Sequence, residues 1–360
     1  MNLSKNASIL LNFLKQNYGK KIISGQMTCT WNYNFDFIEA VFRDTGKYPA
    51  MAGFDFMNML EKPPRKMMNK NYENDRKYHN QHGHLEILKA EEWHKKGGIV
   101  TFAWHWYVKG SNGMTAFYAA NENGNVTDFR IPYDKAKSNP SENTYLLDKK
   151  SPAFKTILSD CKKVAKMLLK LKKKNIPVLW RPLHEASGGW FWWGCGDKNG
   201  TNKAECFIAL WRWMVEYFRK KGLDNLIWVY NGQNKDWYPG DEYCDIIGED
   251  IYASVSGKTD LSSQKEIFLS ALSCQEKSEG EKKLVALTET GTIPSIDECV
   301  KDNTLWSWFM VWNDCKFEND MPKGEDGNLW SGELHNPLAH RKAVYQDSRV
   351  ITLEDLKLFS

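Results

Sequence analysis

Eight near-continuous apolar runs constrain the fold of this chain more than any other feature of the sequence. They cover residues 21–27, 48–56, 97–106, 176–185, 225–232, 245–253, 284–291 and 304–314. A strand that is buried on both faces gives a continuous apolar run, whereas a strand with one face in water alternates apolar and polar residues. The runs therefore predict parallel strands that are covered on both sides.

Amphipathic helices are expected between most of these strands. Within 154–175, apolar residues recur in steps of three and four, at Ile157, Cys161, Val164, Leu168 and Leu171. Residues 83–97 and 204–222 show the same periodicity, and each segment ends at a glycine, as helices often do. Repeated strand–helix alternation predicts an α/β fold, the (β/α)8 or TIM barrel, as a single domain over residues 1–360.

A doubly wound open sheet is the alternative fold for such a pattern. That fold usually carries a glycine-rich phosphate loop after its first strand. The corresponding segment here, ISGQMTCTW (23–31), has a single glycine. The barrel is therefore preferred, and its long connections 57–82 and 107–153 would leave the carboxyl ends of strands, where barrel enzymes build their sites.

Composition excludes several classes of protein. The net charge is only +4 and no long basic run occurs, so nucleic-acid binding is not indicated. No apolar stretch reaches the ~20 residues that cross a bilayer. Aromatic residues are in excess, with 16 Trp, 15 Tyr and 17 Phe. Such a set suits either an aromatic core or a ligand with flat apolar faces, such as a pyranose sugar.

Cysteines and histidines give no metal-site signature. The eight cysteines include no Cys-x-x-Cys pair, and several lie within predicted strands or helices, where a buried free thiol is common. His79, His82 and His84 cluster on a polar loop that enters a helix, which favours surface histidines over metal ligands. The nucleotide-binding and hydrolase motifs G-x-x-x-x-G-K-[ST], G-x-S-x-G and H-E-x-x-H are absent.

Two glutamates stand at the ends of predicted strands. Arg181, His184 and Glu185 end the fourth strand, and Glu289 ends the seventh. Carboxylates on opposing sides of a small barrel can face each other across its mouth. Glycoside hydrolysis needs such a pair, and a separation of about 5–5.5 Å gives retention of configuration through a covalent intermediate. We expect Glu185 to have the raised pKa and Glu289 to stay ionised.

Three motifs carry a resemblance to a known family. They are WRPLHEASGGWFWWG (180–194), TETG (288–291) and TFAWHW (101–106). Together they resemble glycoside hydrolase family 26, whose principal members are β-mannanases, over roughly residues 20–315. The resemblance implies a (β/α)8 barrel, retaining hydrolysis, and neither a metal nor an organic cofactor.

The resemblance also implies roles for single residues. Glu185 resembles the general acid/base and Glu289 the nucleophile. His184 would lie near the sugar 2-hydroxyl, and His105 resembles the family's histidine in the −1 subsite. Arg181 would orient the carboxylates and lower the pKa of the nucleophile through its fixed charge.

Further matches concern the edges of the site. Tyr252 resembles the tyrosine that hydrogen-bonds the nucleophile, and Trp190 and Trp312 resemble sugar-stacking platforms. Four further tryptophans could be platforms or core: Trp192, Trp193, Trp306 and Trp308. Pro294 stands where some family members place a substrate-contacting aromatic residue, so the positive subsites depart from the family pattern.

The expected activity is endo-acting hydrolysis of β-1,4-linked mannose in mannan, glucomannan or galactomannan. The alternatives are the same chemistry on mixed-linkage β-glucan or β-1,3-xylan, an exo-acting enzyme that releases mannobiose, a non-catalytic sugar-binding protein, and a metal-dependent barrel hydrolase. His184 and His105 favour mannose.

The expected partner is a β-mannan-type polysaccharide or oligosaccharide, with no nucleic acid or membrane partner, and a monomer is the default. Polysaccharides do not enter cells, so we expect a secreted protein whose signal peptide is absent from this sequence. A cytoplasmic enzyme acting on imported oligosaccharides is the alternative. No appended carbohydrate-binding module is recognised.

Overall fold

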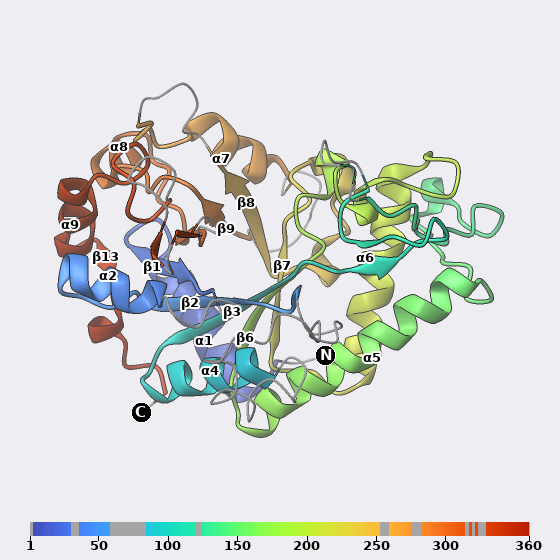
Figure 1. Ribbon diagram of the computed structural model, residues 1–360, viewed down its shortest axis with the longest axis horizontal. Helices are drawn as coiled ribbons and strands as arrows, with labels where there is room; N and C mark the ends of the chain where they lie inside the picture. The colour runs from blue at the N-terminus through green and yellow to red at the C-terminus, as the bar shows by residue number, and fades with distance from the viewer. Residues whose placement is uncertain are drawn as a thin grey trace.

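The fold is a closed barrel of eight parallel strands surrounded by helices (Figure 1). The computed structural model describes residues 3–29, 36–57, 84–119, 124, 126–252, 259–274, 283–313, 317–318, 321–322 and 329–359. The barrel strands are β1 (Ile22–Met27), β2 (Met51–Asp55), β3 (Ile99–Trp104), β6 (Val178–Pro182), β7 (Leu226–Tyr230), β8 (Ile246–Ile251), β9 (Leu284–Thr290) and β10 (Trp308–Val311). Each pairs in parallel with the next, and β10 pairs with β1. The predicted TIM barrel is confirmed.

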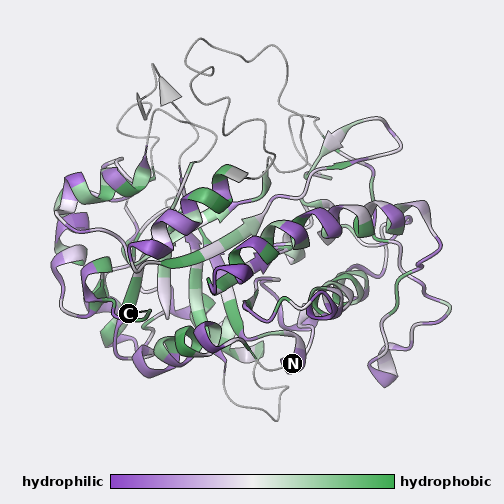
Figure 2. Cartoon of the chain, turned by 90° about the horizontal axis from the view of Figure 1, so that it is seen from below, coloured by the Kyte–Doolittle hydropathy of each residue, from purple (hydrophilic) through white to green (hydrophobic). Residues whose placement is uncertain are grey.

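Helix α1 (Lys5–Asn17) precedes the first strand, and helices follow most of the strands, as the periodicity predicts. The other helices are α2 (Phe37–Thr45), α4 (His84–Lys95), α5 (Pro152–Lys173), α6 (Lys203–Lys220), α7 (Lys265–Leu272), α8 (Ile296–Lys301) and α9 (Leu338–Gln346). The start of α5 is well defined, because the Ser151 side chain accepts a hydrogen bond from the Phe154 N–H and Pro152 occupies the first turn. The helices turn their apolar faces to the strands, which are mostly hydrophobic along their length (Figure 2).

One connection departs from the predicted alternation. The fully described segment between β7 and β8 contains two short 3-10 helices, η6 (Lys235–Trp237) and η7 (Asp241–Tyr243), and no α-helix. This connection is short, and Pro239 and Gly240 lie in its middle, which does not allow an uninterrupted helix.

The barrel has two apolar cores. One lies between the strands and the helices, and the other fills the interior of the barrel. Each strand contributes a residue to the interior core: Ile23, Met51, Ile99, Leu179, Ile227, Ile246, Leu284 and Trp308. Helix α1 adds Ala7, Leu10 and Leu14 to this interior core, and the backbone N–H of Ser4 bonds the carbonyl of Asp224 just before β7. Helix α1 therefore covers the amino-terminal end of the barrel and leaves the opposite end for a site.

Most of the aromatic excess is structural. Among the described residues, nine tryptophans are less than 2% exposed, out of 16 in the sequence. They include all four tryptophans that the sequence leaves undecided, Trp192, Trp193, Trp306 and Trp308, which are therefore core residues and not sugar platforms. The free thiols of the described chain include Cys161, Cys195, Cys206, Cys244 and Cys299.

The remaining elements are short. They are β4 (Val108–Lys109), β5 (Thr115–Ala116), β11 (Phe317–Glu318), β12 (Met321–Pro322), β13 (Val350–Ile351), η3 (Pro140–Glu142), η4 (Ala186–Gly188), η5 (Trp192–Gly194) and η9 (Leu353–Asp355). The connection predicted over 57–82 lies almost wholly outside the described residues, as do His79, His82 and the side chain of His84. No helix in the described part of the chain combines the length and apolar composition that crossing a membrane requires.

Candidate active site

Glu185 lies on a tight turn beyond the end of its strand. The predicted strand 176–185 is too long, since β6 ends at Pro182. Leu183 and Glu185 have left-handed backbones, with φ of 55° and 51°. Such conformations cost non-glycine residues about 1–3 kcal/mol each and are common at functional sites. The Glu185 N–H offsets part of this cost by donating to the Asn231 carbonyl at 2.7 Å and to Asn231 Oδ1 at 3.1 Å.

Glu289 reaches the barrel mouth because β9 contains a bulge. Leu287 pairs with Glu249 on β8, but Asp250 pairs with Glu289, so Thr288 is an extra residue on β9. The register with β10 shifts in the same region. Side chains alternate along a regular strand, so without the bulge Thr288 would face inward and Glu289 outward. With it, both side chains reach the interior.

Arg181 joins the carboxylates of two strands. It follows Leu179 on the inward face of β6 and is 4% exposed. Its Nη1 donates to Asp250 Oδ2 at 2.7 Å, and its Nη2 forms an ion pair with Glu289 Oε1. The second carboxylate oxygen of Glu289, Oε2, accepts a hydrogen bond of 2.6 Å from the Tyr252 hydroxyl. Glu289 is thus a buried carboxylate that is held by one cation and one hydroxyl.

Asp250 is the functional residue that sequence reasoning missed most clearly. Its Oδ1 accepts hydrogen bonds from Asn231 Nδ2 at 2.7 Å and from Thr288 Oγ1 at 2.6 Å. Burial raises the pKa of Asp250 to about 7, with Arg181 lowering it and Glu289 raising it. The sequence does contain a signal for Asp250. This residue follows Ile246 and Gly248 at every second position, which is the spacing of residues that face the barrel interior.

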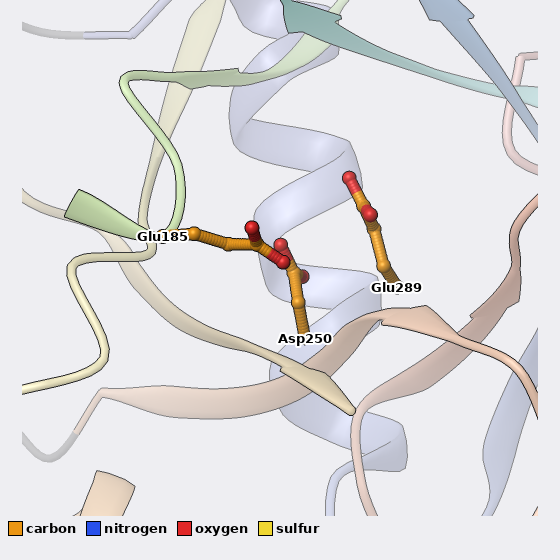
Figure 3. A group of neighbouring side chains, drawn as sticks. All are labelled: Glu185, Asp250 and Glu289. Carbon is orange, nitrogen blue, oxygen red and sulfur yellow. The ribbon is translucent and has the colours of Figure 1, made fainter. Parts of the chain in front are cut away.

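The carboxyl groups of Glu185, Asp250 and Glu289 converge from three elements (Figure 3). Each offers an oxygen, and these atoms lie within 4.8 Å of one another. Burial, followed by the charges of Asp250 and Glu289, raises the pKa of Glu185 to about 9. Trp190 Nε1 donates to Glu185 Oε2 at 2.9 Å, which lowers that pKa.

Three clustered carboxyl groups could hold a cation, and the side chain of Arg181 provides a positive charge at this place. The Arg181 guanidinium contacts two of the three carboxyl groups, those of Asp250 and Glu289. The residues present therefore form an arginine-neutralised acidic cluster. Among the described residues, these carboxyl groups are the only ones close enough together to suit a metal ion.

His105 and His184 lie next to each other in the same mouth. His105 follows the end of β3 at Trp104, so the predicted strand 97–106 extends two residues too far at each end. Its Nε2 is 3.2 Å from His184 Nε2, and its Nδ1 contacts Asp55 Oδ2 at the end of β2. Both ring nitrogens of His105 are therefore engaged by protein groups. Sequence reasoning missed Asp55, an isolated acid in an otherwise apolar run.

Aromatic side chains surround the carboxyl cluster. Trp190 is 38% exposed, and its ring packs over Gly188, where a Cβ would lie 2.1 Å from it. Trp312 follows β10, is partly exposed, and its ring centroid is 5.7 Å from that of His105. Tyr252 follows β8 and is 42% exposed. Pro294 is buried.

The structure therefore brings the predicted site residues together at one end of the barrel. Arg181, Glu289 and Tyr252 are in direct contact, as are Glu185 and Trp190. His105, His184 and Trp312 form the neighbouring group. Asn231, Asp250 and Thr288 connect the first two groups, and Asp55 holds His105. The sequence analysis singles out none of these four residues.

Comparison with known proteins gives consistent similarities. The family described as glycosyl hydrolase family 26 matches residues 1–355. A mannan endo-1,4-β-mannosidase of Thermothelomyces thermophilus is 30% identical over 358 residues, which are 98% of this chain and 61% of that protein. Mannan endo-1,4-β-mannosidase B of Piromyces sp is 35% identical over 313 residues, which are 85% of this chain and 46% of that protein.

A solved structure resembles the chain over its whole length. It is the crystal structure of a β-mannanase from a symbiotic protist of the termite Reticulitermes speratus, complexed with a gluco-manno-oligosaccharide. The TM-score is 0.76 at 31% identity, and the match covers 100% of this chain and 97% of that one. By contrast, the chain spans only 61% and 46% of the length of the two curated relatives.

Proposed function

This chain belongs to glycosyl hydrolase family 26, and on that premise we propose that it hydrolyses internal β-1,4-mannosidic bonds with retention of configuration. Glu289 is the nucleophile and Glu185 the general acid/base of this proposal. The observation that carries it is the pair of facing carboxyl groups with different surroundings. Glu289 is ion-paired to Arg181, whereas burial and negative neighbours raise the pKa of Glu185 to about 9.

The spacing of the carboxyl groups supports retention. Oxygen atoms of Glu185 and Glu289 lie within 4.8 Å of each other. Retaining enzymes place their two carboxyl groups about 5–5.5 Å apart, whereas inverting enzymes need about 6.5–9.5 Å to admit a water molecule between carboxylate and sugar. The short spacing favours direct attack by Glu289.

The reaction then proceeds in two balanced steps. A Glu289 oxygen bonds to the anomeric carbon as the glycosidic C–O bond breaks, and Glu185 gives its proton to the leaving oxygen. Water then loses a proton to Glu185 and its oxygen attacks the same carbon, which releases Glu289. Arg181 and Tyr252 stabilise the Glu289 carboxylate before the first step and after the second.

Mannose is proposed as the substrate sugar because of the relatives. The curated relatives above are named as mannan endo-1,4-β-mannosidases, and the similar crystal structure contains a gluco-manno-oligosaccharide. His105 and His184 stand beside the carboxyl cluster, where the −1 sugar would lie. Since polysaccharides do not enter cells, we also propose that the enzyme acts outside the cell.

The test is reducing-sugar release from linear mannan, glucomannan, mixed-linkage β-glucan and β-1,3-xylan, with a chelator present. We expect activity on mannan and glucomannan, with a mixture of oligosaccharides as early products, as endo action requires. Activity only on the glucan or the xylan would leave the chemistry in place and overturn the mannose assignment. Dependence on a metal would overturn the proposed mechanism.

A further inference from the structure

Asp55 is a fully buried carboxylate at the barrel mouth that takes no part in the two reaction steps. Its Oδ1 accepts hydrogen bonds from the backbone N–H groups of His105 at 3.0 Å and Met57 at 2.8 Å. Its Oδ2 contacts Nδ1 of the His105 ring. Asp55 therefore holds both the backbone and the imidazole of His105, and it links the carboxyl ends of β2 and β3.

The contact continues to a second imidazole. His105 Nε2 lies 3.2 Å from His184 Nε2, and a hydrogen bond between two nitrogens needs one proton. If both nitrogens of His105 are protonated, its Nε2–H donates to His184, and the proton of a neutral His184 must then reside on Nδ1. In the described structure, His184 Nδ1 is buried without a hydrogen-bond partner.

We propose that Asp55 is a positioning residue that keeps a positive charge on His105 beside the nucleophile and thereby fixes His184 as its neutral Nδ1–H tautomer. The inference rests on the proposed function, because the charge matters through Glu289. It concerns the Asp55–His105–His184 chain, which the two reaction steps do not use. Asp55 acts through His105 and does not touch the substrate.

The charges around His105 come from three strands. Burial alone would lower the pKa of His105, but Asp55 on β2 and Glu289 on β9 raise it above the ordinary value, against Arg181 on β6. Burial holds the pKa of His184 well below its ordinary range, and His105 and Arg181 lower it further. Of the two adjacent imidazoles, only that of His105 therefore carries a positive charge.

A fixed cation here would serve the second chemical step. Glu289 loses its negative charge when it bonds to the sugar and regains it when the intermediate is hydrolysed. Preorganised positive charge stabilises the carboxylate that departs in the second step. Arg181 supplies one such charge, and His105 supplies a second whose presence depends on Asp55.

The experiment compares Asp55→Asn with Asp160→Asn. Asp160 is also buried and its Oδ2 accepts a hydrogen bond from a ring nitrogen, Trp106 Nε1, at 3.1 Å, but it lies on α5 outside the barrel. The readout is kcat against pH on an activated aryl β-mannobioside, for which hydrolysis of the covalent intermediate limits the rate. Glu185 acts as a base in that step, so loss of its proton at high pH does not limit this rate.

We expect Asp55→Asn to lower kcat about ten- to a hundredfold, the range for losing a hydrogen bond to a charged group. The alkaline limb should also move to lower pH, because a less basic His105 loses its proton earlier. Asp160→Asn should leave the limb in place. A limb that does not move in Asp55→Asn would show a merely structural role and overturn the proposal.

Imidazole ¹⁵N NMR of the whole wild-type chain gives a test that does not depend on activity or on the folding of a variant. Comparison with His105→Gln identifies the His105 signals. We expect both ring nitrogens of His105 to remain protonated above pH 6.5, with His184 neutral. A neutral His105 at that pH would overturn the proposal, whereas a wild-type chain that cleaves no mannoside would overturn only the proposed function.

Discussion

Glu185 and Glu289 are chemically identical side chains that face the same space, yet the protein surrounds them differently. Glu289 lies within a strand, is 3% exposed, and receives a guanidinium and a hydroxyl on its two oxygens. Glu185 lies on a strained turn, and its carboxyl group receives one indole N–H. Its nearest charges include the two carboxylates of Asp250 and Glu289.

The difference teaches how one residue type is given two roles. Glu289, the proposed nucleophile, has its two carboxylate oxygens held by a guanidinium and a hydroxyl, which fixes them in position for attack. Burial among negative charges stabilises the neutral form of Glu185, which a proton donor requires. Each variant below changes one of these environments and so tests whether the two carboxyl groups differ as proposed.

Replacing Glu289, the proposed nucleophile, should have the largest effect. In Glu289→Ala, no atom can form the covalent intermediate, so kcat/KM should fall about 10⁴–10⁶-fold, as when catalytic nucleophiles are removed elsewhere. The loss should be equal for mannan and for activated aryl mannosides, since both need the same attack. Substantial activity on either substrate would contradict the role of Glu289.

Replacing the acid should produce an uneven loss. In Glu185→Ala, cleavage of mannan should fall about 10²–10⁴-fold, the usual contribution of general acid–base catalysis. The first step on an aryl substrate with a good leaving group should be nearly unaffected, because that group departs without a proton. Stopped-flow measurement of the aryl burst checks this, and equal losses on both substrates would refute the assignment.

Removing Arg181 should destabilise the folded protein. Arg181→Met leaves Asp250 and Glu289 buried without their cation, which should lower the free energy of unfolding by about 3–5 kcal/mol. The loss should be smaller below about pH 7, because Asp250, whose pKa is already raised to about 7, takes up a proton more readily once Arg181 no longer opposes it. Urea denaturation at two pH values measures it.

Arg43→Met is the matched control for this loss. The Arg43 side chain is 58% exposed and pairs with Asp44 on the surface. This variant should change stability by less than about 1 kcal/mol. A comparable loss in the two variants would mean that the buried ion pairs of Arg181 have no special contribution.

Removing the indole N–H of Trp190 should have the smallest effect, and it should shift the pKa of Glu185 in one direction only. Trp190→Phe keeps an aromatic ring but loses the donor that favours the Glu185 carboxylate, so the pKa of Glu185 should rise above about 9. Glu185 must be protonated to act as an acid. The alkaline limb of kcat/KM on mannan should therefore move to higher pH, with less than about a tenfold change at neutral pH.

Trp312→Phe should leave that limb where it is, because the hydrogen bond to Glu185 comes from Trp190. If the limb moves equally in the two variants, the hydrogen bond from Trp190 does not set the proton affinity of Glu185.

The barrel and the candidate glutamates are readable from the sequence for different reasons. Strands buried on both faces leave continuous apolar runs, and Glu185 and Glu289 stand out because charged residues end such runs. The aromatic excess is ambiguous, because stacking platforms and core tryptophans look alike until burial is known. In the structure most of them are core.

Other parts of the site depend on contacts between strands, which composition and periodicity do not encode. Asp55 is a single acid in an apolar run, and Asp250 directly follows another acid, Glu249. Their roles depend on contacts with His105 and Arg181, which come from other parts of the barrel. The sequence also does not reveal that β6 ends before Glu185 or that both ring nitrogens of His105 contact protein groups.

The extra residue on β9 has a consequence for anyone who would rebuild this barrel. A designer who regularised the strand by deleting Thr288 would obtain tidier pairing with β8 and β10. Glu289 would then take the inward position of the deleted residue. Asp250 would lose the hydrogen bond that it accepts from the Thr288 hydroxyl. Keeping Thr288 while removing the bulge would instead turn Glu289 toward the helices. The bulge in β9 is therefore as necessary to the site as the side chains that β9 carries.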